Sequence, residues 1–199
     1  MTEKWTKEQA WEWYNSRPWI TGFNFIPKDS ISGIELFQEW GHEEAMKNAE
    51  KEIALAEELG FNSVRMMLPF YIWRVQHDAF MAHLEELLCM LDRHHITLMP
   101  ILFNDCSVPK ERYKEPDPVP GYFGGSPVTP FDDDTQGGEL IGWNIDDDPA
   151  MKPVIEQYVK ELGRKYGKDE RVIVWNVWNE PGNSGRLSKS LPMMENVFR

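Results

Sequence analysis

The chain has 199 residues, of which 41% are hydrophobic and 27% are charged, and its formal net charge is −12. This composition is typical of a globular protein with one hydrophobic core. The negative charge argues against nucleic acid and anionic membrane surfaces as partners, because both attract clusters of Lys and Arg. It is compatible with a neutral substrate.

The N-terminal residues 1–8 contain no apolar core of a secretory signal, and no stretch approaches the ~18 apolar residues of a membrane helix. Of the two cysteines, Cys89 lies in a predicted helix and Cys106 follows a predicted strand. A reduced, cytoplasmic protein is therefore expected. The alternative is an exported protein whose signal was lost in cloning.

Apolar runs alternate with helical patterns along the chain, which predicts a single α/β domain with a parallel sheet over residues 1–199. The first strand is predicted at about 19–26, ahead of Pro27. A helix is predicted from about 43 to 59, with Gly60 as its C-terminal stop. Its buried stripe is predicted to contain Ala45, Ala49, Ile53, Ala56 and Leu59.

The second and third strands are predicted at about 63–68 and 97–103. Between them the spacing predicts a helix that ends near His94. Its predicted buried residues are Phe80, Leu84, Leu87, Leu88 and Leu91. Pro100 has no backbone N–H to donate, so it predicts a bulge or another irregularity in the third strand.

Residues from about 104 to 148 are rich in Pro and Gly and show no periodicity, which predicts a long loop. Loops of this length in compact domains are more often functional than not. A third helix is predicted between Pro153 and Gly167, and a fourth strand at about 171–179. The buried face of that helix is predicted to hold Ile155, Tyr158, Leu162 and Tyr166. Residues from Leu191 onward are predicted to begin another helix.

The fourth strand ends in Asn179-Glu180-Pro181. In parallel α/β proteins the carboxyl ends of the strands form the edge where chemistry is done. Retaining cleavage of a glycosidic bond needs an acid that keeps its proton near neutral pH and a second carboxyl group as nucleophile. Glu180 suits the role of the acid, and Asn179 that of a ligand for a sugar hydroxyl. Alternatively, Asn179 caps a turn and Glu180 is a solvated loop acid.

Further polar and aromatic residues are predicted at the same edge. Arg65 lies in an otherwise apolar strand, where a buried guanidinium needs partners; a surface salt bridge is the alternative. Hydrogen-bonding candidates at the strand ends are Asn24, Asn104 and Asp105, each of which can instead form a turn. Trp143 in the long loop and Trp73 beyond the second strand can stack on sugar faces, with core packing as the alternative.

No motif for a nucleotide or a metal ion is recognisable. The sequence contains no Gly-x-Gly-x-x-Gly after the first strand and no Gly-Lys-Ser/Thr. The acidic runs at 132–134 and 146–148 lack the ligand spacing of an EF-hand, so solvated loop charge explains them better. No cofactor and no metal are expected.

Four segments of the chain resemble the N-terminal half of clan A glycoside hydrolases, in particular cellulase-like bacterial proteins often labelled 1,4-β-xylanase. The matching segments are 18–27, 60–65, 100–106 and 174–181. The resemblance implies the first four βα units of a (β/α)₈ TIM barrel. It also implies that Glu180 is the general acid/base, that Asn179 holds the 2-hydroxyl of the sugar, and that Arg65 keeps the nucleophile ionised.

In that clan the nucleophile is a glutamate at the end of the seventh strand, which is expected in a C-terminal half that this chain lacks. The chain alone is therefore expected to be inactive. Its open strand edges are expected to favour self-association. The alternatives to a β-glycan hydrolase are a non-catalytic carbohydrate-binding or interaction half-barrel and an inactive truncated fragment.

Overall fold

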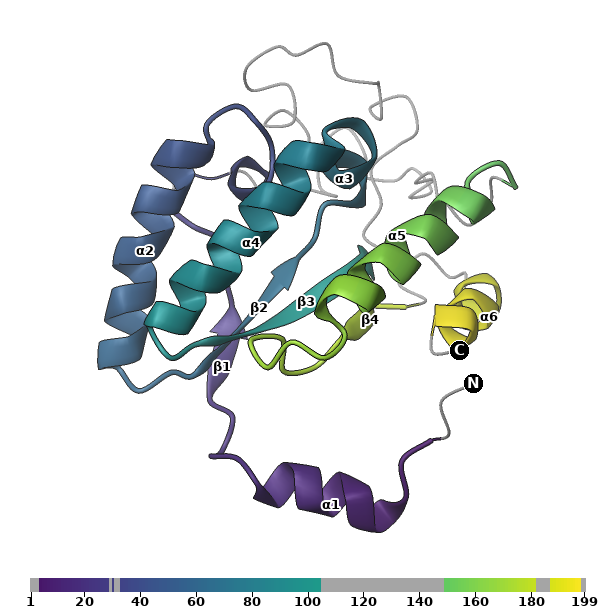
Figure 1. The fold of residues 1–199 in the computed structure, drawn as a ribbon, viewed down its shortest axis with the longest axis horizontal. Helices are drawn as coiled ribbons and strands as arrows, with labels where there is room; N and C mark the ends of the chain where they lie inside the picture. Colours follow the sequence, from purple (N-terminus) through teal and green to yellow (C-terminus); the bar gives the residue numbers. More distant parts are fainter. Residues whose placement is uncertain (1–3, 29, 31–32, 105–148, 182–186, 198–199) are drawn as a thin grey trace, which may run out of the picture.

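A computed structural model describes residues 4–28, 30, 33–104, 149–181 and 187–197. It is an α/β structure around a four-stranded parallel sheet of order β1-β2-β3-β4 (Figure 1). The strands are β1 (Gly22–Asn24), β2 (Ser63–Met67), β3 (Thr97–Asn104) and β4 (Asn176–Asn179). The helices are α1 (Lys7–Asn15), α2 (His42–Glu58), α3 (Phe70–Val75), α4 (His77–Arg93), α5 (Lys152–Tyr166) and α6 (Leu187–Val197), with a 3₁₀ turn η1 (Ile34–Leu36). The predicted α/β class and parallel sheet are confirmed.

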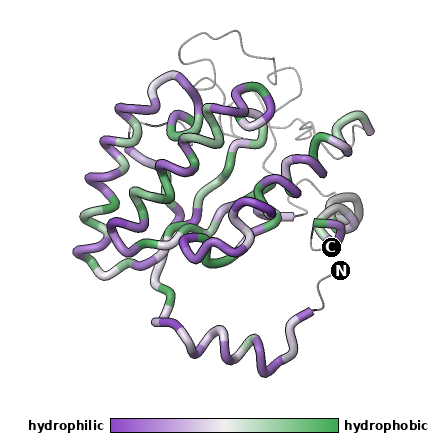
Figure 2. The backbone as a smooth tube through the Cα atoms, in the orientation of Figure 1, coloured by the Kyte–Doolittle hydropathy of each residue, from purple (hydrophilic) through white to green (hydrophobic). Residues whose placement is uncertain are grey.

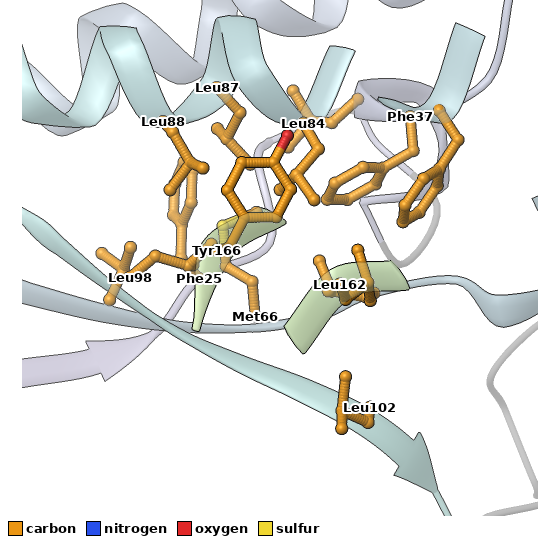
Figure 3. Close-up of a cluster of buried hydrophobic side chains, with 14 of the residues drawn as sticks. Phe25, Phe37, Met66, Leu84, Leu87, Leu88, Leu98, Leu102, Leu162 and Tyr166 are labelled. Carbon is orange, nitrogen blue, oxygen red and sulfur yellow. The ribbon is translucent and has the colours of Figure 1, made fainter. Parts of the chain in front are cut away.

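One hydrophobic core fills the space between the sheet and helices α2, α4 and α5, which cover the same face (Figures 1 and 3). Side chains alternate along β2, so Val64 and Met66 are buried under the helices while Arg65 points to the other face. Hydrophilic and hydrophobic residues alternate along α2 and α4 (Figure 2). This arrangement leaves the Arg65 face of the sheet without a helical layer in the described part of the chain.

The predicted buried stripes of α4 and α5 are confirmed. Both helices turn every predicted apolar residue inward, with exposed fractions of 6% or less. Each fully buried Leu or Phe contributes about 1.5–3 kcal/mol relative to an exposed one, so these stripes hold the two helices against the sheet. Pro153 lies in the first turn of α5, as predicted.

The stripe predicted for α2 is wrong at its C-terminal end, while Ala45 at its start is partly buried against the core. Ala49, Ile53 and Ala56 are buried, but Leu59 is 69% exposed. The helix ends there in the predicted way: Gly60, with φ of 85°, donates to Glu57, and the next N–H donates to the carbonyl of Ala56. Because the chain turns away at Gly60, Leu59 lies outside the core, and Met46 and His42 extend the buried face instead.

The predicted strands at the two sheet edges are too long. β1 pairs with β2 over only three residues, and Trp19, at the predicted start, is 74% exposed. β4 begins at Asn176, and before it only a single bridge joins Val172 to Leu98. Central strands β2 and β3, paired on both sides, match their predicted ranges closely.

The predicted irregularity at Pro100 is present, on the side of β3 that faces β4. The backbone N–H and carbonyl of Leu98 both bond the segment before β4. Two residues further on, the backbone of Pro100 faces the same side, but proline has no N–H to donate. The pairing is interrupted between Leu98↔Val172 and Ile101↔Asn176. One extra residue on the β4 side fills the gap, as in a β-bulge.

Two helices were not predicted. Helix α1 is capped by Thr6, which accepts from the Gln9 N–H while the Gln9 side chain accepts from the Thr6 N–H. None of its residues is buried, and it lies apart from the sheet and its helices (Figures 1 and 2). Helix α3 is a short segment that begins directly after Pro69.

Among the described helices, none is both long enough and apolar enough to cross a bilayer.

The pairing of β1 with β2 leaves no room for a side chain at Gly22. A Cβ there would lie 2.6 Å from the carbonyl oxygen of Ser63. We expect Gly22→Ala to lower the free energy of unfolding by about 1–3 kcal/mol, measured by urea denaturation. The control is Gly163→Ala in α5, where a Cβ meets nothing within 4 Å; it should raise stability by about 0.5–1 kcal/mol. Equal effects of the two substitutions would contradict the register of β1.

Candidate functional site

The four strands bring together one arginine and four asparagines, with Asn24, Asn104 and Asn179 at the carboxyl ends of β1, β3 and β4. Arg65 in β2 donates from Nη1 to Asn24 Oδ1 at 2.9 Å. Its Nη2 donates to Asn176 Oδ1 at 3.0 Å and to Asn179 Oδ1 at 2.7 Å. Asn179 Nδ2 donates in turn to Asn104 Oδ1 at 2.8 Å. These five residues, here named the Arg65 cluster, draw on every strand of the sheet.

Four of these residues were predicted at this edge, and the structure brings Asn24, Arg65, Asn104 and Asn179 together. The side-chain amides are oriented by the arginine, which has donors only, so each amide within reach must turn its oxygen toward it. The alternative of a surface salt bridge for Arg65 finds no support. The guanidinium bonds three neutral amide oxygens and forms no ion pair with a described residue.

Asn176 is the member that sequence analysis missed. Arg65 pairs with Met99, and Ile101, two residues further along β3, lies on the same face and pairs with Asn176. The extra residue opposite Pro100 sets this pairing, because an unbroken ladder from Leu98↔Val172 would place Trp175 there. The irregularity at Pro100 therefore determines which side chain reaches Arg65.

Glu180 follows directly after Asn179 at the tip of β4, as predicted. Its backbone has φ of 50°, in the left-handed region that residues with a Cβ adopt at a cost of about 1–2 kcal/mol. Its side chain is exposed. The burial expected of a general acid is therefore not provided by the described residues.

Trp73 is not part of the predicted sugar-binding edge. Its ring is 3% exposed in the core, and its Nε1 donates to Glu161 Oε2 at 2.9 Å. The same carboxylate bonds His77 Nε2 and, together with Asp78 on Nδ1, raises the pKa of that imidazole. Trp73 thus ties α3 to α5, and core packing accounts for it. Asp105 and Trp143 lie outside the described residues.

Within the described ranges, no group of three or more His, Cys, Asp or Glu side chains is arranged to hold a metal ion. Cys89 is exposed and not in a disulfide, and Cys106 is outside these ranges.

Comparison with known proteins adds no relative. No protein-family model matches the chain, and neither a curated protein nor a solved structure matches it. The geometry of the Arg65 cluster and of Glu180 is therefore the basis for any functional proposal.

The Arg65 cluster depends on the planar, forked guanidinium. Arg65→Lys keeps the charge but presents a single ammonium that cannot reach the same oxygens in the same geometry. We expect it to lower the free energy of unfolding by about 1–3 kcal/mol in urea denaturation. Arg164→Lys, at an exposed position of α5, is the matched control and should change stability by less than about 0.5 kcal/mol. If Arg65→Lys leaves the free energy of unfolding unchanged, the cluster does not hold the four strands together.

The left-handed backbone at Glu180 predicts an unusual order of substitutions. Glu180→Gly should be more stable than Glu180→Ala by about 1 kcal/mol, because glycine adopts positive φ without a Cβ clash. At Glu156, an exposed residue within helix α5, the order should be reversed by a similar amount, about 1 kcal/mol. Urea denaturation of the four variants measures both differences. The same order at both positions would rule out a strained backbone at Glu180.

Proposed function

We propose that this chain supplies the acid/base half of a retaining glycoside hydrolase that acts on a β-linked polysaccharide or oligosaccharide. The observation that carries the proposal is the junction of Asn179-Glu180 with the Arg65 cluster at the carboxyl edge of a parallel sheet. A strained backbone at a carboxylic acid next to a polar cluster is a pattern of functional sites.

The sheet topology supports a barrel over a doubly wound sheet. A doubly wound sheet reverses its strand order, and its ligands bind at the reversal. Here the strands follow chain order, and α2, α4 and α5 lie on one face, as in consecutive units of a (β/α)₈ barrel. In that proposal Arg65 faces the barrel interior, and β1 and β4 pair with strands of a C-terminal half.

The proposed chemistry assigns a role to each described group. Glu180 protonates the leaving oxygen of the scissile bond. The Asn179 amide, held by Arg65 and Asn104, bonds a hydroxyl next to the reacting carbon. Arg65 is a cation whose described partners are neutral amides, so its charge is available to stabilise a carboxylate nucleophile. That nucleophile belongs to the C-terminal half, and no cofactor is required.

A second candidate is a carbohydrate-binding half-barrel without catalysis. The exposure of Glu180 favours it, because an acid needs a desolvated setting to keep its proton near neutral pH. Amides that both donate and accept suit sugar hydroxyls in either proposal. Under the hydrolase proposal, the substrate and the C-terminal half desolvate Glu180.

An aryl β-glycoside assay tests the hydrolase proposal. The chain is compared with a version extended by its downstream coding sequence, each with and without Glu180→Gln. We expect turnover in the extended protein and a fall of about 10²–10⁴ in kcat/KM with Glu180→Gln, because the amide cannot protonate the leaving group. Glu8→Gln, an exposed carboxyl in α1, is the control and should leave kcat/KM unchanged.

Titration with β-linked oligosaccharides separates the remaining outcomes. Binding without turnover in both proteins would reject the hydrolase and support the carbohydrate-binding half-barrel. Neither binding nor turnover would reject both and leave an inert fragment.

A further inference from the structure

Two histidines stack face to face between helices α2 and α4. The rings of His42 and His83 lie with centroids 3.5 Å apart and planes 6° from parallel. His42 is the first residue of α2, and His83 lies in the middle of α4. Neither residue belongs to the Arg65 cluster.

The stacked pair holds the segment that connects β1 to α2. His42 Nδ1 bonds the carbonyl oxygen of Leu36 at 2.9 Å, and His83 Nδ1 bonds that of Phe37 at 3.1 Å. A carbonyl only accepts, so both Nδ1 atoms must carry a proton and donate. Leu36 and Phe37 are fully buried, and Phe37 stacks on Phe80 of α4. Residues 33–41, here named the η1 segment, are thereby fastened to α4.

The two rings cannot both be charged without repulsion. His42 Nε2 also lies 3.0 Å from Glu86 Oε2, on the same helix as His83. Burial and the neighbouring His42 lower the pKa of His83, against the opposing influence of Glu86 from α4 and Glu39 from the η1 segment. A second proton on the stack therefore places two parallel cations in van der Waals contact.

We propose that the His42–His83 stack is an acid-operated latch for the η1 segment. While at most one of the two rings is protonated the latch is closed, and the segment is held against α4. When both rings are protonated the cations repel each other, and the η1 segment separates from α4. This device is independent of the proposed hydrolase activity.

The direction of the pH effect follows from the lowered pKa of His83. The closed state binds fewer protons than the open state below the ordinary histidine value of 6.5. Closure is therefore complete above pH 6.5 and weakens as the pH falls from 6.5 toward the depressed pKa of the closed state. Each unit of depression increases the open fraction by about tenfold over that window.

Amide hydrogen exchange of the full chain between pH 7.5 and 5.0, corrected for intrinsic rates, tests the latch. The N–H groups of Leu36, Phe37 and Gln38 are hydrogen-bonded within the η1 segment and report on it directly. On acidification we expect their protection to fall by about tenfold per unit of pKa depression relative to β2 and β3. His83→Gln should abolish this dependence. His95→Gln, at a histidine that is 85% exposed, should preserve it.

A second variant keeps the test decisive if His83→Gln does not fold. Glu86 raises the pKa of His83 in the closed state, so Glu86→Gln should depress that pKa further and enlarge the loss of protection at pH 5.0 relative to the unmodified chain. Protection of the η1 segment that does not change with pH would overturn the latch. So would the same acid response in His83→Gln, or an unchanged loss of protection in Glu86→Gln.

Discussion

The arrangement of the strands depends on the guanidinium of Arg65, which needs hydrogen-bond acceptors toward the carboxyl edge of the sheet. Arg65 carries a permanent charge on the face that the helices do not cover. Its guanidinium has only N–H donors, so every hydrogen bond that it makes needs an acceptor from another residue. Amides from β1 and β4 meet its requirement, although these strands do not pair with each other in the described sheet. One side chain thus fixes the relative positions of both edge strands at their carboxyl ends.

The opposite end of the sheet shows a different use of arginine. Arg171, before β4, lies 2.6 Å from Asp169 and 2.8 Å from Glu85, and these bonds raise its pKa and lower that of Asp169. That charge is neutralised within the chain, as expected of a stabilising contact. The guanidinium of Arg65 bonds neutral amides, and no described carboxylate neutralises its charge.

The sequence predicted the elements whose signals are local and strong. The stripes of α4 and α5 are apolar at helical spacing, and Gly60 supplies a positive φ, so both were recognisable. Exposure of Leu59 and the shortness of β1 depend on tertiary packing and partner strands, which no local pattern contains. Asn176 could not be placed because one extra residue opposite Pro100 decides which face it occupies. The role of Glu180 as an acid is a prediction that the fold alone does not test.

The η1 segment and the Arg65 cluster are held by separate interactions, although β1 connects them: Asn24 is its last residue, and the η1 segment follows it in the chain. Phe25, the residue after β1, is 5% exposed, and its N–H donates to the carbonyl oxygen of Arg65 at 2.9 Å. Neither this bond nor the Arg65–Asn24 contact involves a histidine. Protonation of the stack therefore changes only contacts of the η1 segment, which comes later in the chain. Opening of the latch would therefore free residues 33–41 and leave Asn24 against Arg65. An acid-induced change in exchange at the η1 segment can thus be separated from any change in sugar binding at the strand ends.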